Sequence, residues 1–342
     1  MKIRVKWVDT AKFLGIFAIY LGHFGEVLNK SLAFVYQFHV ALFFLLSGCM
    51  SNYDKEDNVF NFIKKKFKNI MIPFFAFSLI SLFAYVLLNN CNILTVLEQF
   101  KIILFGNIRN TFFAMSLWFL SCLFLMEVIF KVLRQLDSKL LILLISLIMF
   151  VIAEGFIIPR PIIEPHWFYN LDSVFYYAVF YAIGYIAYPF ILKWFQLNTK
   201  NDKFFFLISS LILTIYAIGV FFGINYLEKI LNFIPVIRVL TPIFTTLPLI
   251  LFILILARLI DKINLFNEIG NNTLFLCCNE FIIKSCISSF CSAFSLSINF
   301  TLPIQVYLYT MLLLILEVKV IIPFEKKLIN SIHSEFTSNK NS

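Results

Sequence analysis

Charged residues are scarce in this chain. Only 14% of its 342 residues are Asp, Glu, Lys or Arg, whereas soluble domains carry about 25%. No hydrophilic stretch is long enough to form a separate soluble domain, and 61% of the residues are hydrophobic, including 44 Phe. This composition excludes an ordinary soluble protein and indicates one integral membrane domain over residues 1–330, followed by a polar tail over 331–342.

The seven cysteines lack any C-x-x-C spacing, and their number is odd. We therefore expect neither a disulfide framework nor a zinc site, and no metal. The first apolar run also lacks the small-residue cleavage site of a signal peptide and is interrupted by Lys12. We expect this run to remain as a membrane anchor.

Long apolar runs recur along the whole chain. A helix needs roughly 20 apolar residues to cross a bilayer core. The sequence thus predicts an all-α polytopic fold with ten spans, at about 9–27, 33–50, 70–89, 112–130, 140–158, 172–192, 204–222, 238–257, 269–291 and 302–322. The segment 93–106 is too short and too charged for a span, so we expect an interfacial or re-entrant piece there.

The net charge of +9 comes from short loops between the apolar runs. If the N-terminus lies inside, 20 of the 28 Lys and Arg residues fall on the inner face and seven on the outer face and the spans leading to it. This positive-inside bias predicts that both termini are cytoplasmic, and it explains the basic charge without nucleic acid.

The first span carries ionisable residues. Lys12 and His23 are eleven residues apart, which places them on one helical face about 16 Å apart, and Asp9 falls on the same side. Asp9 could cap the helix and Lys12 could reach the headgroups. His23 lies deeper, where an ionisable group usually faces a protein interior or a wet cavity, so we favour a functional role for it.

Two further polar features have a plain and a functional interpretation. Four lysines crowd the approach to the third span, Lys64, Lys65, Lys66 and Lys68. They are either a positive-inside anchor, which charge alone favours, or a phosphate-binding patch. The outer loop 159–172 contains Arg160, Trp167 and Tyr169, which suit a sugar face but equally an interfacial anchor, and composition alone favours the anchor.

Six segments in a fixed order resemble the acyltransferase-3 family of membrane O-acyltransferases, most of all its fucose 4-O-acetylase-like branch. They are WVDTAKFLGIFAIYLGHFG, FHVALFFLLSG, FIKKKFKNIMIPFF, LWFLSCLFLMEVIF, VFYYAVFYAIGYIAYP and EIGNNTLFLCCNEFII, and they extend from residue 7 to about 283. The resemblance implies a ten-helix domain that moves acetyl groups from cytoplasmic acetyl-CoA to sugar hydroxyls of surface polysaccharides or their lipid-linked precursors. It also implies a multi-pass protein of a bacterial cytoplasmic membrane, and a homo-oligomer is compatible with it.

The resemblance also bears on individual residues. Lys12 and His23 occupy the positions where many members have a basic residue and an essential histidine. Lys65 and Lys68 have the spacing of the family's basic pair, although Asn69 stands where many members have Arg. The late segment often carries a histidine, but this chain has Asn279-Glu280 there, and we assign these two residues no catalytic role.

Acetyl transfer to a hydroxyl needs a base near the alcohol and stabilisation of an oxyanion. Imidazole titrates near neutral pH, so His23 is the predicted general base, or alternatively a transient acyl carrier. Lys12 is expected to contact CoA or polarise the acyl group, and Asp9 to orient the cationic side of the site. The CoA phosphates are assigned to Lys65, Lys66 and Lys68.

Two other functions fit the same features. A transporter or flippase for a lipid-linked sugar or small metabolite could use ten helices and an intramembrane polar face equally well. The sequence shows no inverted repeat and no pair of broken helices, which counts against it. A non-catalytic partner in glycan synthesis is the third interpretation, and the Asn69 and Asn279 departures are its only support.

Overall fold

The computed structural model describes residues 5–54, 58–89, 91–106, 108–109, 116–233, 235–296 and 298–327. Throughout these ranges the regular elements are helices, as the sequence predicts, and no strand occurs among them. The predicted polar tail over 331–342 lies outside the described residues.

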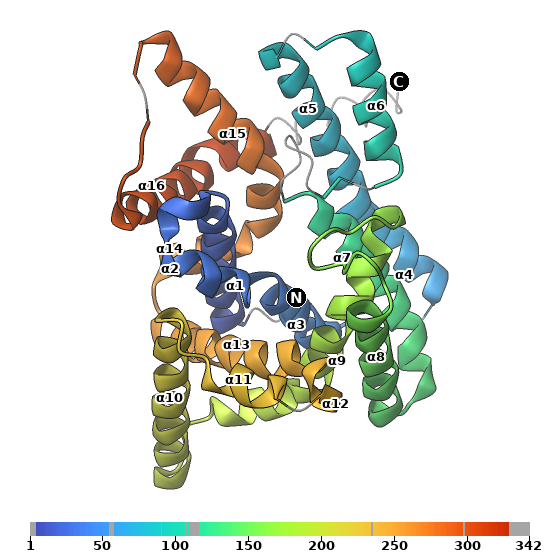
Figure 1. The fold of residues 1–342 in the computed structure, drawn as a ribbon, viewed down its shortest axis with the longest axis vertical. Helices are drawn as coiled ribbons and strands as arrows, with labels where there is room; N and C mark the ends of the chain where they lie inside the picture. Colours follow the sequence, from blue (N-terminus) through green and yellow to red (C-terminus); the bar gives the residue numbers. More distant parts are fainter. Residues whose placement is uncertain are drawn as a thin grey trace, which may run out of the picture.

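Sixteen α-helices form the described fold (Figure 1). Their bounds are α1 Lys6–Gly22, α2 Lys30–Tyr36, α3 His39–Ser51, α4 Val59–Lys66, α5 Ile72–Asn89, α6 Ile93–Leu104, α7 Trp118–Leu133, α8 Lys139–Gly155, α9 Leu171–Trp194, α10 Lys200–Phe221, α11 Tyr226–Asn232, α12 Pro235–Arg238, α13 Thr241–Ile260, α14 Asn264–Asn271, α15 Thr273–Ala293 and α16 Pro303–Leu316.

Seven described helical segments are long and apolar enough to cross a membrane: 30–51, 59–89, 168–194, 200–221, 241–260, 273–293 and 303–327. Three more predicted spans correspond to α1, α7 and α8, which are helical but have only 17, 16 and 17 residues. Seven of the ten predicted spans therefore coincide with helices that are long and apolar enough to cross a membrane, and the total of ten stays a prediction. The 12-residue α6 covers most of the segment 93–106 and is too short to cross a bilayer core.

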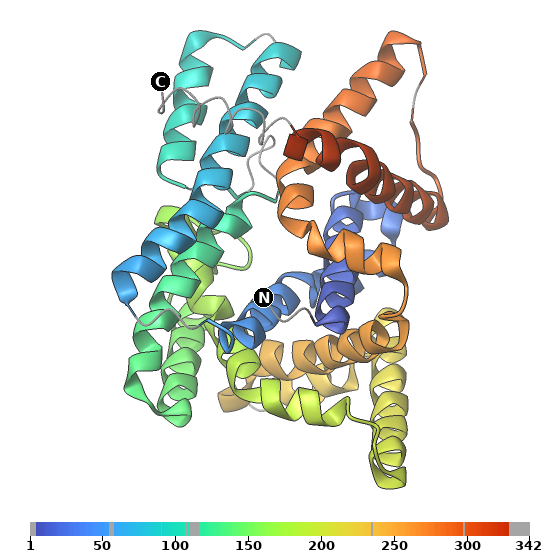
Figure 2. The same cartoon turned by 180° about the vertical axis from the view of Figure 1, so that it is seen from behind.

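Helices α1 and α3 lie in the middle of the molecule (Figures 1 and 2). Helices α5–α8 lie to one side of this pair and α15 and α16 to the other. Helices α3 and α9 cross at very short range. A Cβ atom on Gly48 would lie 2.0 Å from the Tyr181 carbonyl oxygen, and one on Gly184 would lie 2.0 Å from that of Leu45. Only glycine permits this approach, which is typical of small-residue packing between membrane helices.

Two of the long helices contain a π-helical turn. The turn η2 (Phe67–Met71) joins α4 to α5 and contains Lys68, the last residue of the lysine cluster. The turn η6 (Glu317–Ile321) follows α16. Such turns often mark functional sites because they shift the side chains that follow them around the helix axis. Here they lie next to the two groups of polar residues described below.

Candidate active site

Helix α1 ends at Gly22, directly before the candidate catalytic residue His23. The backbone N–H of His23 still bonds to the Ile19 carbonyl at 3.3 Å, but the chain then turns at Gly25, whose φ of +64° is unfavourable for other residues. His23 is thus the C-cap of α1. Its side chain borders a cavity of about 480 Å³.

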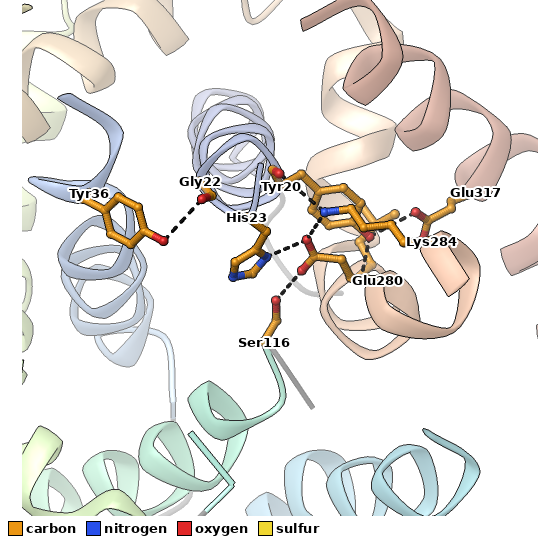
Figure 3. Close-up of polar contacts among 9 residues, drawn as sticks. Tyr20, Gly22, His23, Tyr36, Ser116, Glu280, Lys284 and Glu317 are labelled. Atoms are coloured by element: carbon orange, nitrogen blue, oxygen red, sulfur yellow. Dashed lines mark hydrogen bonds and ion pairs between the residues drawn. The ribbon is translucent and has the colours of Figure 1, made fainter. Parts of the chain in front are cut away.

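Glu280 of α15 holds the His23 ring (Figure 3). Its Oε1 lies 2.6 Å from His23 Nδ1, and its Oε2 accepts a 2.5 Å hydrogen bond from the Ser116 hydroxyl. The Glu280 side chain is 1% exposed. A carboxylate accepts hydrogen bonds, so this contact places the proton of a neutral His23 on Nδ1 and leaves Nε2 as an acceptor.

A second layer of contacts fixes Glu280 itself. Lys284, one turn further along α15, donates to Glu280 Oε1 at 2.7 Å and packs over the ring of Tyr20. The Tyr20 hydroxyl bonds to the Leu276 carbonyl at 2.8 Å and to Glu317 in η6 at 3.0 Å. Helix α1 is therefore linked to α15 through Glu280 and Leu276 and to the turn η6 through Glu317.

A second histidine borders the same cavity. His39 begins α3, and its Nδ1 lies 2.7 Å from the Val35 carbonyl, which can only accept. His39 thus also presents Nε2 as its acceptor. The ring of Tyr36 packs edge-on against His39, and its hydroxyl donates to the Gly22 carbonyl at 3.3 Å. Two histidines therefore border this cavity, and each has Nε2 as its acceptor nitrogen when its ring is neutral.

Arg109 brings a positive charge to this cavity. Its guanidinium donates to the carbonyls of Pro161 and Ile162 at 2.9 and 3.1 Å and lies 4.3 Å from the Trp118 ring centre. These contacts fasten the loop 159–172 against α7. The cation remains beside the cavity, where it favours negative charge.

Lys12 lines a separate, smaller cavity of about 130 Å³, together with Lys66, Asp54 and Glu127. Lys66 Nζ pairs with Glu127 at 3.0 Å and with Asp54 at 3.7 Å. Lys65, which is half exposed, lies 3.5 Å from Asp54. This site combines three helices, because Lys12 is on α1, Lys66 on α4 and Glu127 on α7.

Phe43 lies between the two cavities on α3. It lines the His23 cavity, while Ser47, one turn further, lines the Lys12 cavity. A Cβ atom on Gly15 would lie 2.7 Å from the Phe43 ring, so this ring rests on α1 between Lys12 and His23. The Phe119 ring packs against it at 5.6 Å. Aromatic side chains thus lie between two separate polar cavities, each of which is lined by residues of α1, α3 and α7.

The structure brings together some of the residues singled out from the sequence. Lys12 and Lys66 share a cavity, and His23 borders a separate one. Lys68 is exposed in the turn η2, between α4 and α5. Asp9 is buried where α1 meets α14, so close that a Cβ atom on Gly270 would lie 1.7 Å from its carbonyl oxygen, and it lines neither cavity.

Several polar residues of the site have no assigned role in the sequence analysis. Glu280 was left without one, although it contacts His23 directly. Ser116, Lys284 and Arg109 were not singled out as site residues either. The sequence does contain a signal for Glu280 and Lys284. They are four residues apart in an otherwise apolar span, where ionisable groups are rare, and the structure pairs them.

Among the described residues, no group of three or more His, Cys, Asp or Glu side chains could hold a metal ion. The polar groups of the His23 cavity instead suit proton transfer and stabilisation of negative charge.

A family model of the acyltransferase domain matches residues 5–318, nearly the whole chain. The chain belongs to the acyltransferase-3 family. Its apolar helices and this membership make it a multi-pass membrane acyltransferase, with an acyl donor and an acyl acceptor as substrates. No curated protein and no solved structure matches the chain significantly.

Proposed function

We propose that this acyltransferase is a membrane O-acetyltransferase of a bacterial cytoplasmic membrane. It moves an acetyl group from cytoplasmic acetyl-CoA to a sugar hydroxyl of a surface polysaccharide or its lipid-linked precursor. The observation that carries this proposal is the contact of His23 Nδ1 with the buried Glu280 carboxylate, at 2.6 Å, beside a cavity inside the helix bundle. With Nδ1 engaged by Glu280, Nε2 is the nitrogen of this cavity-lining side chain that remains for an alcohol.

His23 acts as the general base in this mechanism. Its Nε2 accepts the hydroxyl proton while the sugar oxygen attacks the carbonyl carbon of the thioester. The C–S bond then breaks, and the imidazolium returns the proton to the CoA sulfur. The products are an acetylated sugar and free CoA. Glu280 stabilises the imidazolium and keeps the ring oriented, as the carboxylate does in a catalytic triad.

The negative charge of the tetrahedral intermediate develops near Arg109, whose guanidinium borders the cavity. A fixed cation in a water-poor site stabilises such an oxyanion more strongly than it could in bulk water. Because the contacts of Arg109 with the loop 159–172 hold it in place, little reorganisation is needed during the reaction.

The Lys12 cavity and the lysines beside it are assigned to the acyl donor. Lys65, Lys66 and Lys68 hold CoA phosphates, and Lys12 guides the arm that carries the acetyl group. The pantetheine arm then extends from the Lys12 cavity toward His23, and the Phe43 ring between the two cavities must move to let it pass. Support for this path comes from the placement of Lys12 and His23 beside two cavities that α1, α3 and α7 all line. Asp9 supports the Lys12 end of α1 in this scheme.

The release of free CoA tests this function with purified protein in lipid nanodiscs. A thiol reagent detects CoA released from acetyl-CoA, with and without bacterial envelope glycan as acceptor. We expect glycan to accelerate thiol release and to gain ester-linked acetyl groups. A transporter releases no thiol under either condition, and that result contradicts the proposal.

A further inference from the structure

A second polar cavity adjoins the His23 cavity. It measures about 590 Å³ and shares four lining residues with its neighbour, Tyr36, Val40, Ile162 and Tyr177. Because the two cavities share lining residues they are adjacent, and one extended ligand can reach both. Sites for drug-sized ligands measure about 300–1,000 Å³. Each of these cavities reaches that range by itself, so the two together have room for a ligand larger than one sugar ring.

The charges in the second cavity are balanced. Two carboxylates, Glu154 and Glu228, and two guanidinium groups, Arg160 and Arg238, line it. Arg160 is paired with Glu154 at 3.1 Å, and the Glu154 side chain is only 7% exposed. Because these charges offset each other, the cavity offers many hydrogen-bond donors and acceptors without a net attraction for an anion.

Three threonines near the start of α13 line the cavity, and they differ in their hydrogen bonds. The Thr245 hydroxyl donates to the Thr241 carbonyl at 3.0 Å, and the Thr246 hydroxyl donates to the Gln37 carbonyl at 3.0 Å. Thr241 also lines the cavity, but its buried hydroxyl has no hydrogen-bond partner within the described part of the chain. A buried polar group without a partner is costly and suggests a ligand that completes its hydrogen bonds.

We propose that this second cavity is an acceptor subsite for the neutral sugar residues that adjoin the acetylated one. The inference rests on the proposed function, because it takes the His23 cavity as the site of transfer. A neutral oligosaccharide matches the balanced charges, and its hydroxyls can bond to Glu154, Arg238 and the free hydroxyl of Thr241. The substrate is then an oligosaccharide or a longer glycan, and a monosaccharide fills only part of the site.

Binding without acetyl-CoA tests this inference separately from catalysis. The probes are neutral methyl glycosides, their tri- and tetrasaccharides, and the corresponding uronates, titrated by calorimetry into the full-length protein in nanodiscs. We expect a neutral tetrasaccharide to bind at least tenfold more tightly than its methyl monosaccharide. Thr241→Val and Arg238→Gln each weaken tetrasaccharide binding by about three- to tenfold, the value of one hydrogen bond, and leave monosaccharide binding unchanged.

The matched control is Thr214→Val on α10, whose hydroxyl donates to the Ser210 carbonyl at 2.7 Å and does not line this cavity. It should bind like wild type. Equal affinity for mono- and tetrasaccharides, tighter binding of uronates, binding to no probe, or normal binding by both variants overturns the subsite. Tetrasaccharide binding that depends on Thr241 in a protein that never transfers acetyl groups leaves the subsite standing and overturns the proposed function instead.

Discussion

His23 Nδ1 lies 2.6 Å from Glu280 Oε1, although 257 residues separate the two in the chain. The contact joins the end of α1 to the buried side of α15, and Ser116 and Lys284 bond to the same carboxylate. Glu280 thus links the candidate base to Ser116, which precedes α7, and to Lys284 on its own helix. Its role in the mechanism is to position His23 and stabilise its protonated form.

Replacing Glu280 by Gln tests this role. We expect kcat to fall by about 10²- to 10⁴-fold, because the imidazolium loses its counter-charge, while the KM for acetyl-CoA stays unchanged. Steady-state kinetics of label transfer check both values. The His23→Gln/Glu280→Gln double variant should be no slower than His23→Gln alone, since the two residues act as one unit.

Glu325→Gln is the matched control for that pair. It removes a carboxylate that accepts from Asn279 at 3.0 Å rather than one that contacts His23. Its kcat should remain near the wild-type value. Additive losses in the double variant, or an equal loss in Glu325→Gln, would show that Glu280 contributes only to the fold.

The sequence predicts the helical class and the position of His23 well, because both depend on local features. Runs of apolar residues predict the spans, and an eleven-residue spacing puts Lys12 and His23 on one face. The pairing of His23 with Glu280 depends on how α1 packs against α15 and cannot be read from either segment alone. The same holds for Arg109, which reaches the cavity through contacts with a loop about 50 residues away.

Length also limited the prediction of spans. Helices α1, α7 and α8 lie where spans are predicted but have 16 or 17 residues. Hydropathy cannot separate a short buried helix from a full crossing when both are equally apolar. The small residues that bring α3 and α9 together are visible in the sequence, but their partners across the interface are not.

The exposed lysines Lys65, in α4, and Lys68, in η2, give a prediction for the binding of acetyl-CoA. The Lys65→Gln/Lys68→Gln double variant should raise the KM for acetyl-CoA about three- to tenfold with little change in kcat, because it removes contacts to phosphate but not to the reacting atoms. The effect should shrink with acetyl-3′-dephospho-CoA and at high salt. Lys203→Gln, which removes an exposed lysine at the start of α10, is the control. An unchanged KM in the double variant would show that the lysine cluster does not bind CoA and serves only as a membrane anchor.

The ion pair of Lys66 and Glu127 gives a prediction for stability. Lys66→Met leaves the nearly buried Glu127 carboxylate without its 3.0 Å partner and should destabilise the protein by up to about 3 kcal/mol. The Lys66→Met/Glu127→Leu double variant should recover most of this loss. Thermal unfolding in detergent measures both. Equal melting temperatures for wild type and Lys66→Met would show that the pair contributes nothing to the fold.

The crossing of α3 and α9 is tested by Gly48→Ala. The new methyl group collides with the Tyr181 carbonyl, so we expect a large fall in melting temperature and in the yield of folded protein. Gly155→Ala is the matched control, because a Cβ atom there meets nothing within 4 Å. It should be neutral or slightly stabilising. Normal folding of Gly48→Ala would contradict the close packing of these helices.

The most direct test of the central claim is the transfer of radiolabelled acetyl groups from acetyl-CoA into envelope glycan. Membranes should contain equal amounts of wild type, His23→Gln or His166→Gln, the last of which alters a half-exposed loop histidine outside the His23 cavity. We predict that label enters glycan with wild type and His166→Gln and falls to background with His23→Gln. Transfer by His23→Gln at the wild-type rate would contradict the assignment of His23 as the catalytic base.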